Sequence, residues 1–273
     1  MTSSAPRRAA VLGHPVAHSL SPTLHRAAYA SLGLAGWRYD AVDVTEESLP
    51  AFVAGLDASW VGLSLTMPLK QTVIPLLDHV EPLAEVVGAV NTVLLQGRTL
   101  IGANTDVHGI VAALGLTGPV RSAAVLGAGA TASSTLAALA QLGCVSPVVY
   151  VRSVARAGGL MRAAHRMGVT PVYRTLDAAP GEIGRADVVV STLPPHAADP
   201  LAAGLTTVDG VLLDVAYDPR PTALSVAWAA AGGAVVGGER MLLHQAAEQV
   251  RLMTGHPAPL DAMAAALDAK LSA

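Results

Sequence analysis

The amino-acid sequence predicts an α/β protein with two domains. Two observations lead to this prediction: apolar runs of strand length alternate with helical patterns along the chain, and the charge pattern changes near residue 105. Repeated strand–helix units are typical of mostly parallel sheets covered by helices on both faces. The length of 273 residues suits one large domain or two ordinary ones.

The expected strands are short apolar runs, namely 9–12, 60–64, 123–126, 147–151, 187–190 and 211–214, and a further short strand precedes Gly102. The expected helices carry apolar residues at helical spacing and cover 21–31, 130–142, 222–231 and 239–254. Most of the expected strands are composed mainly of Ala, Val and Leu, because aromatic residues make up only 3% of the chain.

Charge marks the expected domain boundary. No Asp or Glu occurs between Asp106 and Asp177, but that interval holds six arginines: Arg121, Arg152, Arg156, Arg162, Arg166 and Arg174. An acid-free, arginine-bearing block inside an acidic chain favours local anion binding. The sequence therefore changes character near residue 105.

Composition excludes several classes of function. A net charge of −3 argues against a nucleic-acid or anionic-membrane partner. The single cysteine, Cys144, excludes a disulfide framework and is expected to be a small buried thiol. The uncharged stretches 122–151 and 221–238 contain internal Gly, Ser, Gln or Pro, so each is interpreted as strand plus buried helix and not as a membrane span. With no signal-peptide pattern at the N-terminus, a cytoplasmic location is expected.

Lysine is nearly absent from this chain. Only Lys70 and Lys270 occur, against fifteen arginines, and Lys70 lies in an uncharged stretch. Lysine can be tuned to release its proton, whereas arginine cannot. Codon bias explains the scarcity of lysine but not the position of Lys70, which makes this residue a candidate for proton transfer.

The segment GAGATA at 127–132 lies between an expected strand and an expected helix. Gly127 permits a tight turn, Gly129 lets the backbone approach a pyrophosphate, and Ala132 allows close packing of helix on strand. The helix N-terminus adds free N–H groups. This pattern predicts dinucleotide binding; the alternative is a structural turn in an unrelated strand–helix unit.

The residues after the next strand favour NADP over NAD. An NAD site would normally place Asp or Glu there, whereas this chain has Arg152 and Ser153, with Arg156 one turn further. These side chains suit a 2′-phosphate, although Arg156 is also explained as a solvated residue at a helix start. Thr192 and Tyr217 follow later strands, at the sheet edge where a cofactor passes.

Hydroxyl and amide side chains gather in the first half of the chain. Ser19 and Ser21 precede Pro22 and can bind a carboxylate together with N–H groups of the helix start. The alternative for Ser21 is an ordinary N-cap with Pro22 at the first helical position. Asp106 either caps the helix that it precedes or forms a proton-transfer pair with Lys70.

No metal site is expected. His14 and His18 have a spacing found in metal-binding helices, but Pro15 lies between them and no carboxylate is adjacent in sequence.

The order of these motifs resembles the NADP-dependent shikimate dehydrogenase family over nearly the whole chain. The matching segments are GHPVAHSLSPTLH at 13–25, TMPLK at 66–70, Asn91-Thr92, GANTD at 102–106, GAGATA at 127–132 and GGERMLLHQA at 237–246. Any one of them arises by chance, whereas six in order are specific.

The resemblance implies a substrate domain at 1–104, a Rossmann-type NADP-binding domain at 105–238, and C-terminal helices at 239–273 that pack back on the substrate domain. It implies reversible reduction of 3-dehydroshikimate to shikimate, a step of aromatic amino acid biosynthesis, and leaves room for a homodimer. Lys70 and Asp106 would be the catalytic pair. Substrate would be bound by Ser19, Ser21, Thr66, Lys70, Asn91, Asp106, Tyr217 and Gln245. Cofactor would be bound by Gly127, Ala128, Gly129, Ala130, Arg152, Ser153, Arg156, Thr192, Val215 and Gly238.

The chain departs from the family pattern at two positions. The family commonly has Asn-Val-Thr before its lysine, where this chain has Ser64-Leu65-Thr66. The family's cofactor strand often ends Asn-Arg-Thr, where this chain has Val151-Arg152-Ser153. The first change alters an orienting hydrogen bond, and the second removes a polar contact but keeps the arginine.

Three alternatives remain open at this point. A paralogue acting on quinate or an aminated shikimate analogue would share these motifs. A non-catalytic ligand sensor would not need both Lys70 and Asp106. A methylenetetrahydrofolate dehydrogenase shares the two-domain plan but is disfavoured by the serine pair and by the Asn-Thr-Asp motif.

Overall fold

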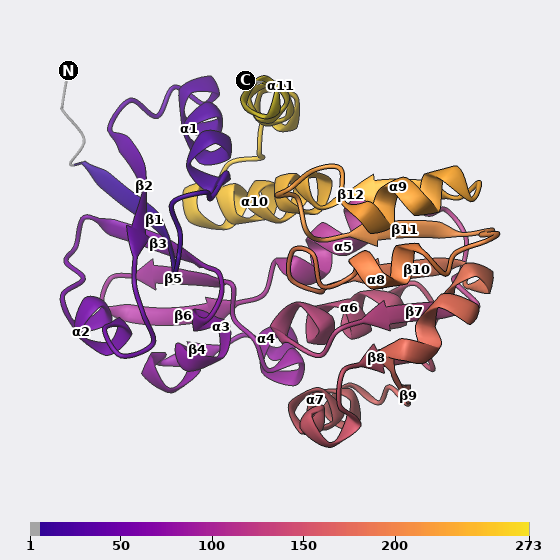
Figure 1. The fold of residues 1–273 in the computed structure, drawn as a ribbon. Coiled ribbons are helices and arrows are strands. Elements are labelled where there is room, and N and C mark those ends of the chain that lie inside the picture. Colours follow the sequence, from indigo (N-terminus) through magenta and orange to yellow (C-terminus); the bar gives the residue numbers. More distant parts are fainter. Residues whose placement is uncertain (1–5, 273) are drawn as a thin grey trace. The chain divides into compact units, whose positions relative to one another are not determined.

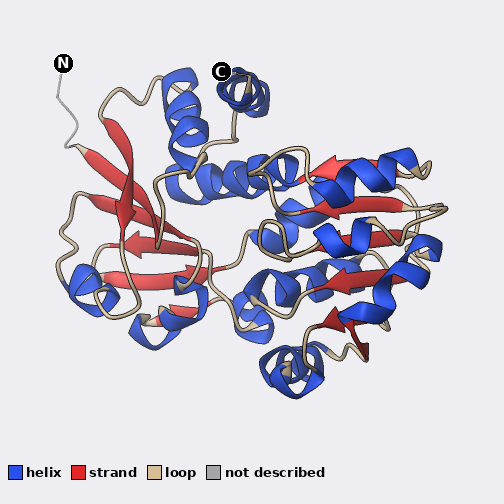
Figure 2. Ribbon diagram, in the orientation of Figure 1, coloured by secondary structure: helices blue, strands red, loops and turns tan. Residues whose placement is uncertain are grey.

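The computed structural model describes residues 6–272, which form two compact units. The first unit runs through Thr105 and resumes at Leu242, and the second runs from Asp106 to Met241. Helix α10 (Gly238–Thr254) starts in the second unit and continues into the first. Figure 1 follows the chain through these elements, and Figure 2 separates helices from strands.

The first unit contains a six-stranded mixed sheet in the order β2-β1-β3-β5-β6-β4. Strand β1 pairs in parallel with β2 and β3, while β5 is antiparallel to both β3 and β6. The strands are β1 (Arg7–Gly13), β2 (Trp37–Asp43), β3 (Trp60–Leu65), β4 (His79–Val80), β5 (Thr92–Gln96) and β6 (Thr99–Ala103).

Helices cover both faces of this sheet. Leu49 and Leu69, from the helices on one face, join strand residues such as Leu12, Leu63 and Val93 in one apolar cluster. Helices α1 and α11 pack on each other, and α10 hydrogen-bonds to side chains of β3 and β5. The helices are α1 (Ser21–Ser31), α2 (Leu49–Ala54), α3 (Leu69–Thr72), α4 (Pro82–Val87), α10 and α11 (Leu260–Leu271), with a 3₁₀ turn η1 (Ile74–Leu76).

The expectation of mostly parallel pairing is wrong for one part of this sheet. β5 and β6 form a hairpin, and its turn places Gly97 at φ +66°, which is the left-handed conformation that glycine adopts without strain. A two-residue connection can join only antiparallel strands, so this pair cannot belong to a strand–helix–strand unit.

The second unit is a doubly wound parallel sheet in the order β12-β11-β10-β7-β8-β9. Its strands are β7 (Ala123–Leu126), β8 (Val148–Val151), β9 (Val172–Thr175), β10 (Val188–Ser191), β11 (Val211–Asp214) and β12 (Ala234–Gly237). The order changes direction between β7 and β10, and ligands of such sheets bind beyond the carboxyl ends of the strands at this point.

The helices of the second unit are α5 (Asp106–Leu114), α6 (Ala130–Gln141), α7 (Gly158–Met167), α8 (Asp199–Ala202) and α9 (Ala223–Ala230), with 3₁₀ turns η2 (Val154–Arg156), η3 (Leu176–Gly181) and η4 (Ile183–Arg185). Trp228 of α9 is fully buried against the face that also carries Leu126 and Leu212. The α/β class with a Rossmann-type second half is therefore confirmed.

Most of the expected elements occur within one or two residues of their expected ends. Strand β10 begins at Val188, one residue later than expected, because the Asp187 N–H donates to the Ser122 hydroxyl at 3.0 Å and not to a neighbouring strand. The Asp187 carboxylate in turn accepts the backbone N–H groups of Arg121 and Ser122, at 2.9 and 3.0 Å. Cys144 is buried, as expected. Within residues 6–272, no helix is both long and apolar enough to cross a membrane.

Candidate active site

Two loops of the first unit meet at the carboxyl ends of β1 and β3. The N–H of Thr66 donates to the Leu12 carbonyl at 2.9 Å, and the N–H of His14 donates to the Met67 carbonyl at 3.0 Å. A Cβ atom at Gly13 would overlap the Thr66 side chain, so only glycine allows this approach. Parallel pairing of β1 with β3 thus brings the serine segment and the lysine segment to one sheet edge.

The serine segment is held by its own side chains. Helix α1 begins at Ser21, and the N-cap position belongs to Leu20, with no side-chain cap. The interpretation of Ser21 as an N-cap is therefore wrong. Instead, the Ser21 N–H donates to the Ser19 hydroxyl at 3.3 Å, which holds that hydroxyl at the start of α1. Ser21 is buried and Ser19 is half-buried.

Lys70 lies in the short helix α3, directly after the loop that contains Thr66. Its carbonyl accepts the Val90 N–H at 2.8 Å, and the Leu65 N–H donates to the Asn91 carbonyl at 2.8 Å. These backbone bonds hold the start of α3 beside the segment that leads into β5. Lys70 and Asn91, 21 positions apart in sequence, are thereby brought to the same region of the first unit.

Asn91 and Gln245 form a buried amide pair. The Asn91 Nδ2 donates to Gln245 Oε1 at 3.3 Å and to Thr105 Oγ1 at 2.9 Å. The Thr105 N–H donates to Asn91 Oδ1 at 2.7 Å. Asp106, which is 3% exposed, follows Thr105 as the first residue of α5. Its pairing with Lys70 stays a prediction.

Ser64 has direct partners that explain how a shorter side chain is accommodated there. Its hydroxyl accepts from the Tyr39 phenol at 2.6 Å and donates to Gln249 Oε1 at 2.7 Å. Burial raises the pKa of Tyr39 far above its ordinary value, so the phenol keeps its proton and acts as a donor. Tyr39 and Gln249 were not among the site residues that the sequence predicted.

In the second unit, the glycine turn has the backbone geometry that its sequence predicts. Gly127 has φ +115°, and a Cβ atom there would overlap Thr192 Oγ1, which itself donates to the Leu126 carbonyl at 2.9 Å. No atom lies within 4 Å of the Cβ position of Gly129, so the backbone is open to a ligand. Helix α6 begins at Ala130 without a side-chain cap, which leaves its first N–H groups for an anion.

The basic residues after β8 differ in their surroundings. Val151 ends the strand as a buried core residue, Arg152 is exposed, and Ser153 is half-buried. Arg156 ends the 3₁₀ turn η2 and is exposed. The position where the family often has Asn therefore contributes packing, while the arginines are free to reach a phosphate from the surface.

The remaining expected residues lie at the carboxyl ends of β10, β11 and β12. The Val215 N–H donates to the Ser191 carbonyl at 2.9 Å. A Cβ atom at Gly238 would overlap the Val215 carbonyl, so glycine is required where α10 starts. Tyr217 is half-buried, and burial raises the pKa of its phenol.

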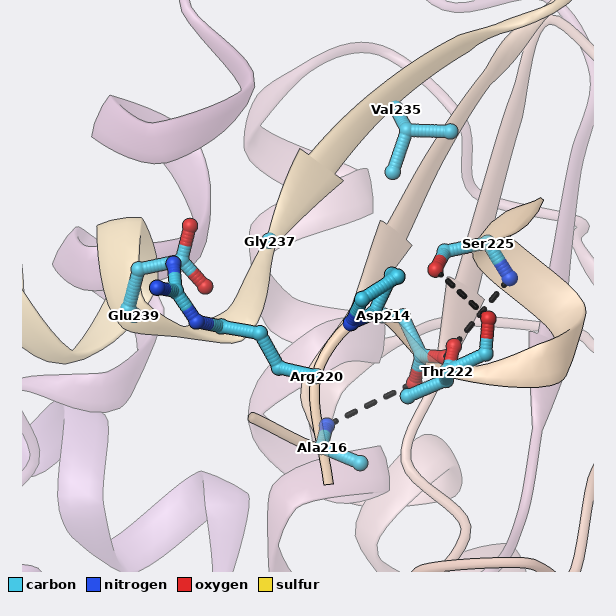
Figure 3. A pocket seen from close by; sticks show the side chains of 9 residues that line it. Asp214, Ala216, Arg220, Thr222, Ser225, Val235, Gly237 and Glu239 are labelled. Atoms are coloured by element: carbon cyan, nitrogen blue, oxygen red, sulfur yellow. Dashed lines mark hydrogen bonds between the residues drawn. The ribbon is translucent and has the colours of Figure 1, made fainter. Parts of the chain in front are cut away.

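A cavity of about 380 Å³ opens beside these strand ends. Asp214, Thr222 and Ser225 line one side of it, while Arg220 and Glu239 lie on the other side (Figure 3). The Thr222 hydroxyl donates to Asp214 Oδ2 at 2.6 Å and accepts the Ser225 N–H at 3.1 Å, which caps α9. Burial raises the pKa of the Asp214 carboxyl, and the Thr222 hydrogen bond opposes this effect.

Within the described part of the chain, no three His, Cys, Asp or Glu side chains lie close enough together to bind a metal ion. The His14 Nδ1 instead lies 2.7 Å from Asp43 Oδ1.

The fold and the two sites define a two-domain, dinucleotide-dependent oxidoreductase. One unit carries a glycine turn with an uncapped helix start, and the other carries hydroxyls, amides and a lysine. The donor set of the second unit fits a phosphorylated dinucleotide, because Gly129 leaves its backbone open and Arg152 supplies an exposed cation.

Comparison with known proteins gives the family. The shikimate dehydrogenase substrate-binding domain matches residues 11–93, and the shikimate 5′-dehydrogenase C-terminal domain matches residues 238–267. A shikimate dehydrogenase (NADP(+)) of Methanothermobacter thermautotrophicus is 36% identical and covers 94% of each chain.

Two solved structures are similar throughout. The Mycobacterium tuberculosis shikimate dehydrogenase is 41% identical, with a TM-score of 0.88, and covers 97% of this chain and 100% of its own. A Thermus thermophilus shikimate 5-dehydrogenase in complex with NADP(H) and shikimate is 35% identical, with a TM-score of 0.84, and covers 96% and 99%. The chain belongs to the shikimate dehydrogenase family.

Proposed function

We propose that this protein is an NADP-dependent shikimate dehydrogenase that reversibly reduces 3-dehydroshikimate to shikimate in aromatic amino acid biosynthesis. The observation that carries the proposal is that the first unit contains Lys70, a buried amide pair and two serine hydroxyls. The chain also aligns with an NADP-dependent relative over 94% of its length. The exposed Arg152 after β8 supports NADP as the cofactor.

The residues of the first unit hold the substrate at both ends. The Ser19 and Ser21 hydroxyls donate to the ring carboxylate, and Thr66, Asn91 and Gln245 bind ring hydroxyls. Hydroxyl and amide donors suit this task because a ring that carries three hydroxyls needs directional partners, which a charge alone does not supply. Tyr217 borders the ring.

Lys70 performs the proton transfer. NADPH, when bound, would supply the hydride that converts the C3 ketone to an alcohol. Negative charge then develops on the ketone oxygen, where the Lys70 ammonium stabilises it and donates one proton. Asp106 orients the ammonium and a neighbouring hydroxyl. In the reverse direction, neutral Lys70 accepts the proton from the shikimate hydroxyl.

The second unit holds the cofactor by its backbone and its arginines. The turn formed by Gly127, Ala128, Gly129 and Ala130 would bind the pyrophosphate through its backbone N–H groups. Arg152, Ser153 and Arg156 would bind the 2′-phosphate. Thr192, Val215 and Gly238 line the path toward the nicotinamide. A homodimer and a cytoplasmic location are further parts of this proposal.

The experiment that tests the function is a panel of ring acids with both cofactors. Shikimate with NADP should give the highest kcat/KM, measured as reduced cofactor, and quinate or an aminated analogue should react more slowly. A higher kcat/KM for quinate with NAD would replace the proposal with a quinate dehydrogenase. Binding of both ligands without turnover would identify a sensor.

A further inference from the structure

Gln249 is a buried side chain of α10 that lies one turn after Gln245. It is 1% exposed, and its amide makes four hydrogen bonds to α1, β3 and the start of β5. One side-chain amide offers two donors and two acceptor lone pairs, so every bonding position of Gln249 is used. Such complete use in the interior of a protein fixes the orientation of the group.

A backbone carbonyl determines which end of this amide is nitrogen. The Asn91 carbonyl oxygen can only accept, so the Gln249 atom 3.2 Å away is Nε2. The oxygen Oε1 then points the other way, toward the Ser64 hydroxyl at 2.7 Å and His25 Nε2 at 3.2 Å.

His25 agrees with this orientation. Burial lowers the pKa of His25 to about 3, so its ring is neutral and carries one N–H. With Nε2 donating to Gln249, the Nδ1 atom is the acceptor that faces the Tyr29 hydroxyl at 3.4 Å. The ring also stacks on Tyr39 with centroids 3.9 Å apart, which holds it in the plane that this bond needs.

The Thr92 hydroxyl passes the orientation of Gln249 on to Asn91. Gln249 Nε2 donates to Thr92 Oγ1 at 2.9 Å, so the single hydroxyl hydrogen is directed at Asn91 Oδ1, also at 2.9 Å. The Thr105 N–H, which can only donate, faces the same Oδ1 at 2.7 Å. Both contacts require the oxygen of Asn91 on this side and its nitrogen on the side of Gln245.

The Gln245 amide is also held in one orientation, and this orientation agrees with that of Asn91. Its Nε2 donates to the Leu242 carbonyl at 3.0 Å, so its Oε1 faces Asn91 Nδ2. A flipped Asn91 would place oxygen against oxygen at Gln245 and nitrogen against the Thr105 N–H. Asn91 Nδ2 uses both hydrogens on Gln245 Oε1 and Thr105 Oγ1, so the ordered Asn91 fixes Gln245 in turn, and Gln245 offers its second Nε2 hydrogen beside Oε1. A donor next to an acceptor matches a hydroxyl, because a hydroxyl both accepts and donates.

We propose that Gln249 is a positioning residue for substrate recognition: through the Thr92 hydroxyl it holds the Asn91 amide with its nitrogen toward Gln245, so that the pair is ordered to bind a ring hydroxyl. This proposal rests on the proposed function, since it assigns Asn91 and Gln245 to the substrate. Gln249 itself does not touch the substrate; it acts through Thr92 and Asn91.

The test removes one hydroxyl. Thr92→Val keeps the shape of the side chain and breaks the link, whereas Thr92→Ser keeps the hydroxyl and serves as the matched control. We expect Thr92→Val to raise the KM for shikimate about 10-fold, which corresponds to ~1.4 kcal/mol, with kcat within about 2-fold and the KM for NADP unchanged. Thr92→Ser should restore the KM for shikimate to near the wild-type value.

A second readout separates positioning from packing. If Asn91 is misoriented, the loss should shrink for a ring acid that lacks one hydroxyl, because there is less for the amide pair to bind. The proposal is overturned if both Thr92 variants raise KM equally, or if the KM for NADP rises in parallel. If Thr92→Val does not fold, as judged by circular dichroism, Gln249→Met removes the same link from its other end. A rise in the KM for shikimate with an unchanged KM for NADP would then support the proposal, and a parallel rise in both would overturn it. Wild-type protein that binds shikimate without turning it over would refute the proposed function instead, and calorimetric Kd values would then replace KM.

Discussion

The two units of this protein recognise small molecules by different means. The first buries polar side chains in its interior. These side chains are buried and hydrogen-bonded to one another, namely His25, Ser64, Asn91, Thr92, Thr105, Gln245 and Gln249. The second has a core of Val, Leu and Ala strands, and it offers a glycine turn, an uncapped helix start and exposed arginines.

The difference follows from what each ligand presents. A small polyhydroxy acid needs a separate directional partner for each hydroxyl, so its site needs side chains in fixed orientations. A dinucleotide presents phosphates, which backbone N–H groups and surface cations can bind without a polar interior. The first unit therefore depends on internal order for function, and the second depends on backbone shape and surface charge.

Removing the Lys70 amine should give the largest effect. Lys70→Ala should lower kcat about 10²- to 10⁴-fold, the range for a lost general acid, while shikimate still binds. Lys270→Ala is the matched control, because it removes the other lysine, on α11, and should leave kcat unchanged. Single-turnover cofactor reduction together with calorimetry measures both properties, and equal kcat in the two variants would contradict the assignment.

Arg152→Gln probes the surface charge of the second unit. Loss of a charge-assisted bond of about 1.5–3 kcal/mol should raise the KM for NADP about 10- to 100-fold and leave the KM for NAD nearly unchanged. Arg162→Gln removes an exposed arginine from α7 and is expected to be neutral. If NAD and NADP are affected alike, the 2′-phosphate is not the partner of Arg152.

Two buried groups, His25 in the first unit and Asp214 in the second, should contribute opposite pH dependences to stability. The pKa of His25 falls from 6.5 unfolded to about 3 folded, so the unfolded chain binds the proton first and stability falls as pH drops below 6.5. Between pH 6.5 and pH 5 this loss is about 2 kcal/mol, at ~1.4 kcal/mol per pH unit. The raised pKa of Asp214 acts the other way, since the folded state keeps a proton longer and loses stability as pH rises through its folded pKa.

Urea unfolding at pH 7 and pH 5 would measure the His25 slope. After Trp37 and Trp60 are changed to Phe, the signal of Trp228 reports on the second unit alone. A His25→Gln variant should reduce the acid sensitivity of the first unit and leave the pH response of the second unit unchanged. The same pH slope in wild type and His25→Gln would show that the imidazole is not the sensitive group.

The smallest expected effect concerns the cap of α9. Thr222→Val removes the N-cap and a donor to Asp214, and should cost about 1–2 kcal/mol of stability with little change in either KM. Thr117→Val, at an exposed position, should stay within about 0.5 kcal/mol. Chemical denaturation compares the two, and equal stabilities would mean that the Thr222 bonds contribute nothing net.

Much of the second unit could be predicted from the sequence. The four inner strands of its sheet, β7, β8, β10 and β11, are mainly apolar runs, whereas the edge strands β9 and β12 were missed. The conformation that Gly127 requires is visible in the glycine pattern itself. In the first unit, β2 was missed because only Tyr39 of its seven residues is buried, so no apolar run marks it. The hairpin of β5 and β6 was missed although Gly97 signals its turn.

The site residues were easier to nominate than to connect. Lys70, Asn91 and Gln245 stand out in the sequence, but their distances depend on pairings between distant segments. Gln249 carries a signal that could have been used, since it lies four residues after Gln245 on a helix and so shares its face. Its four partners come from other elements and could be known only from the fold.

The central claim is that the first unit supplies most of the substrate contacts and the second unit supplies the cofactor contacts. One comparison tests it directly: the KM values for shikimate and NADP in Ser19→Ala and in Arg152→Gln. Ser19→Ala should raise only the KM for shikimate, and Arg152→Gln only the KM for NADP. A rise in the KM for NADP in Ser19→Ala, with the KM for shikimate unchanged, would contradict the claim.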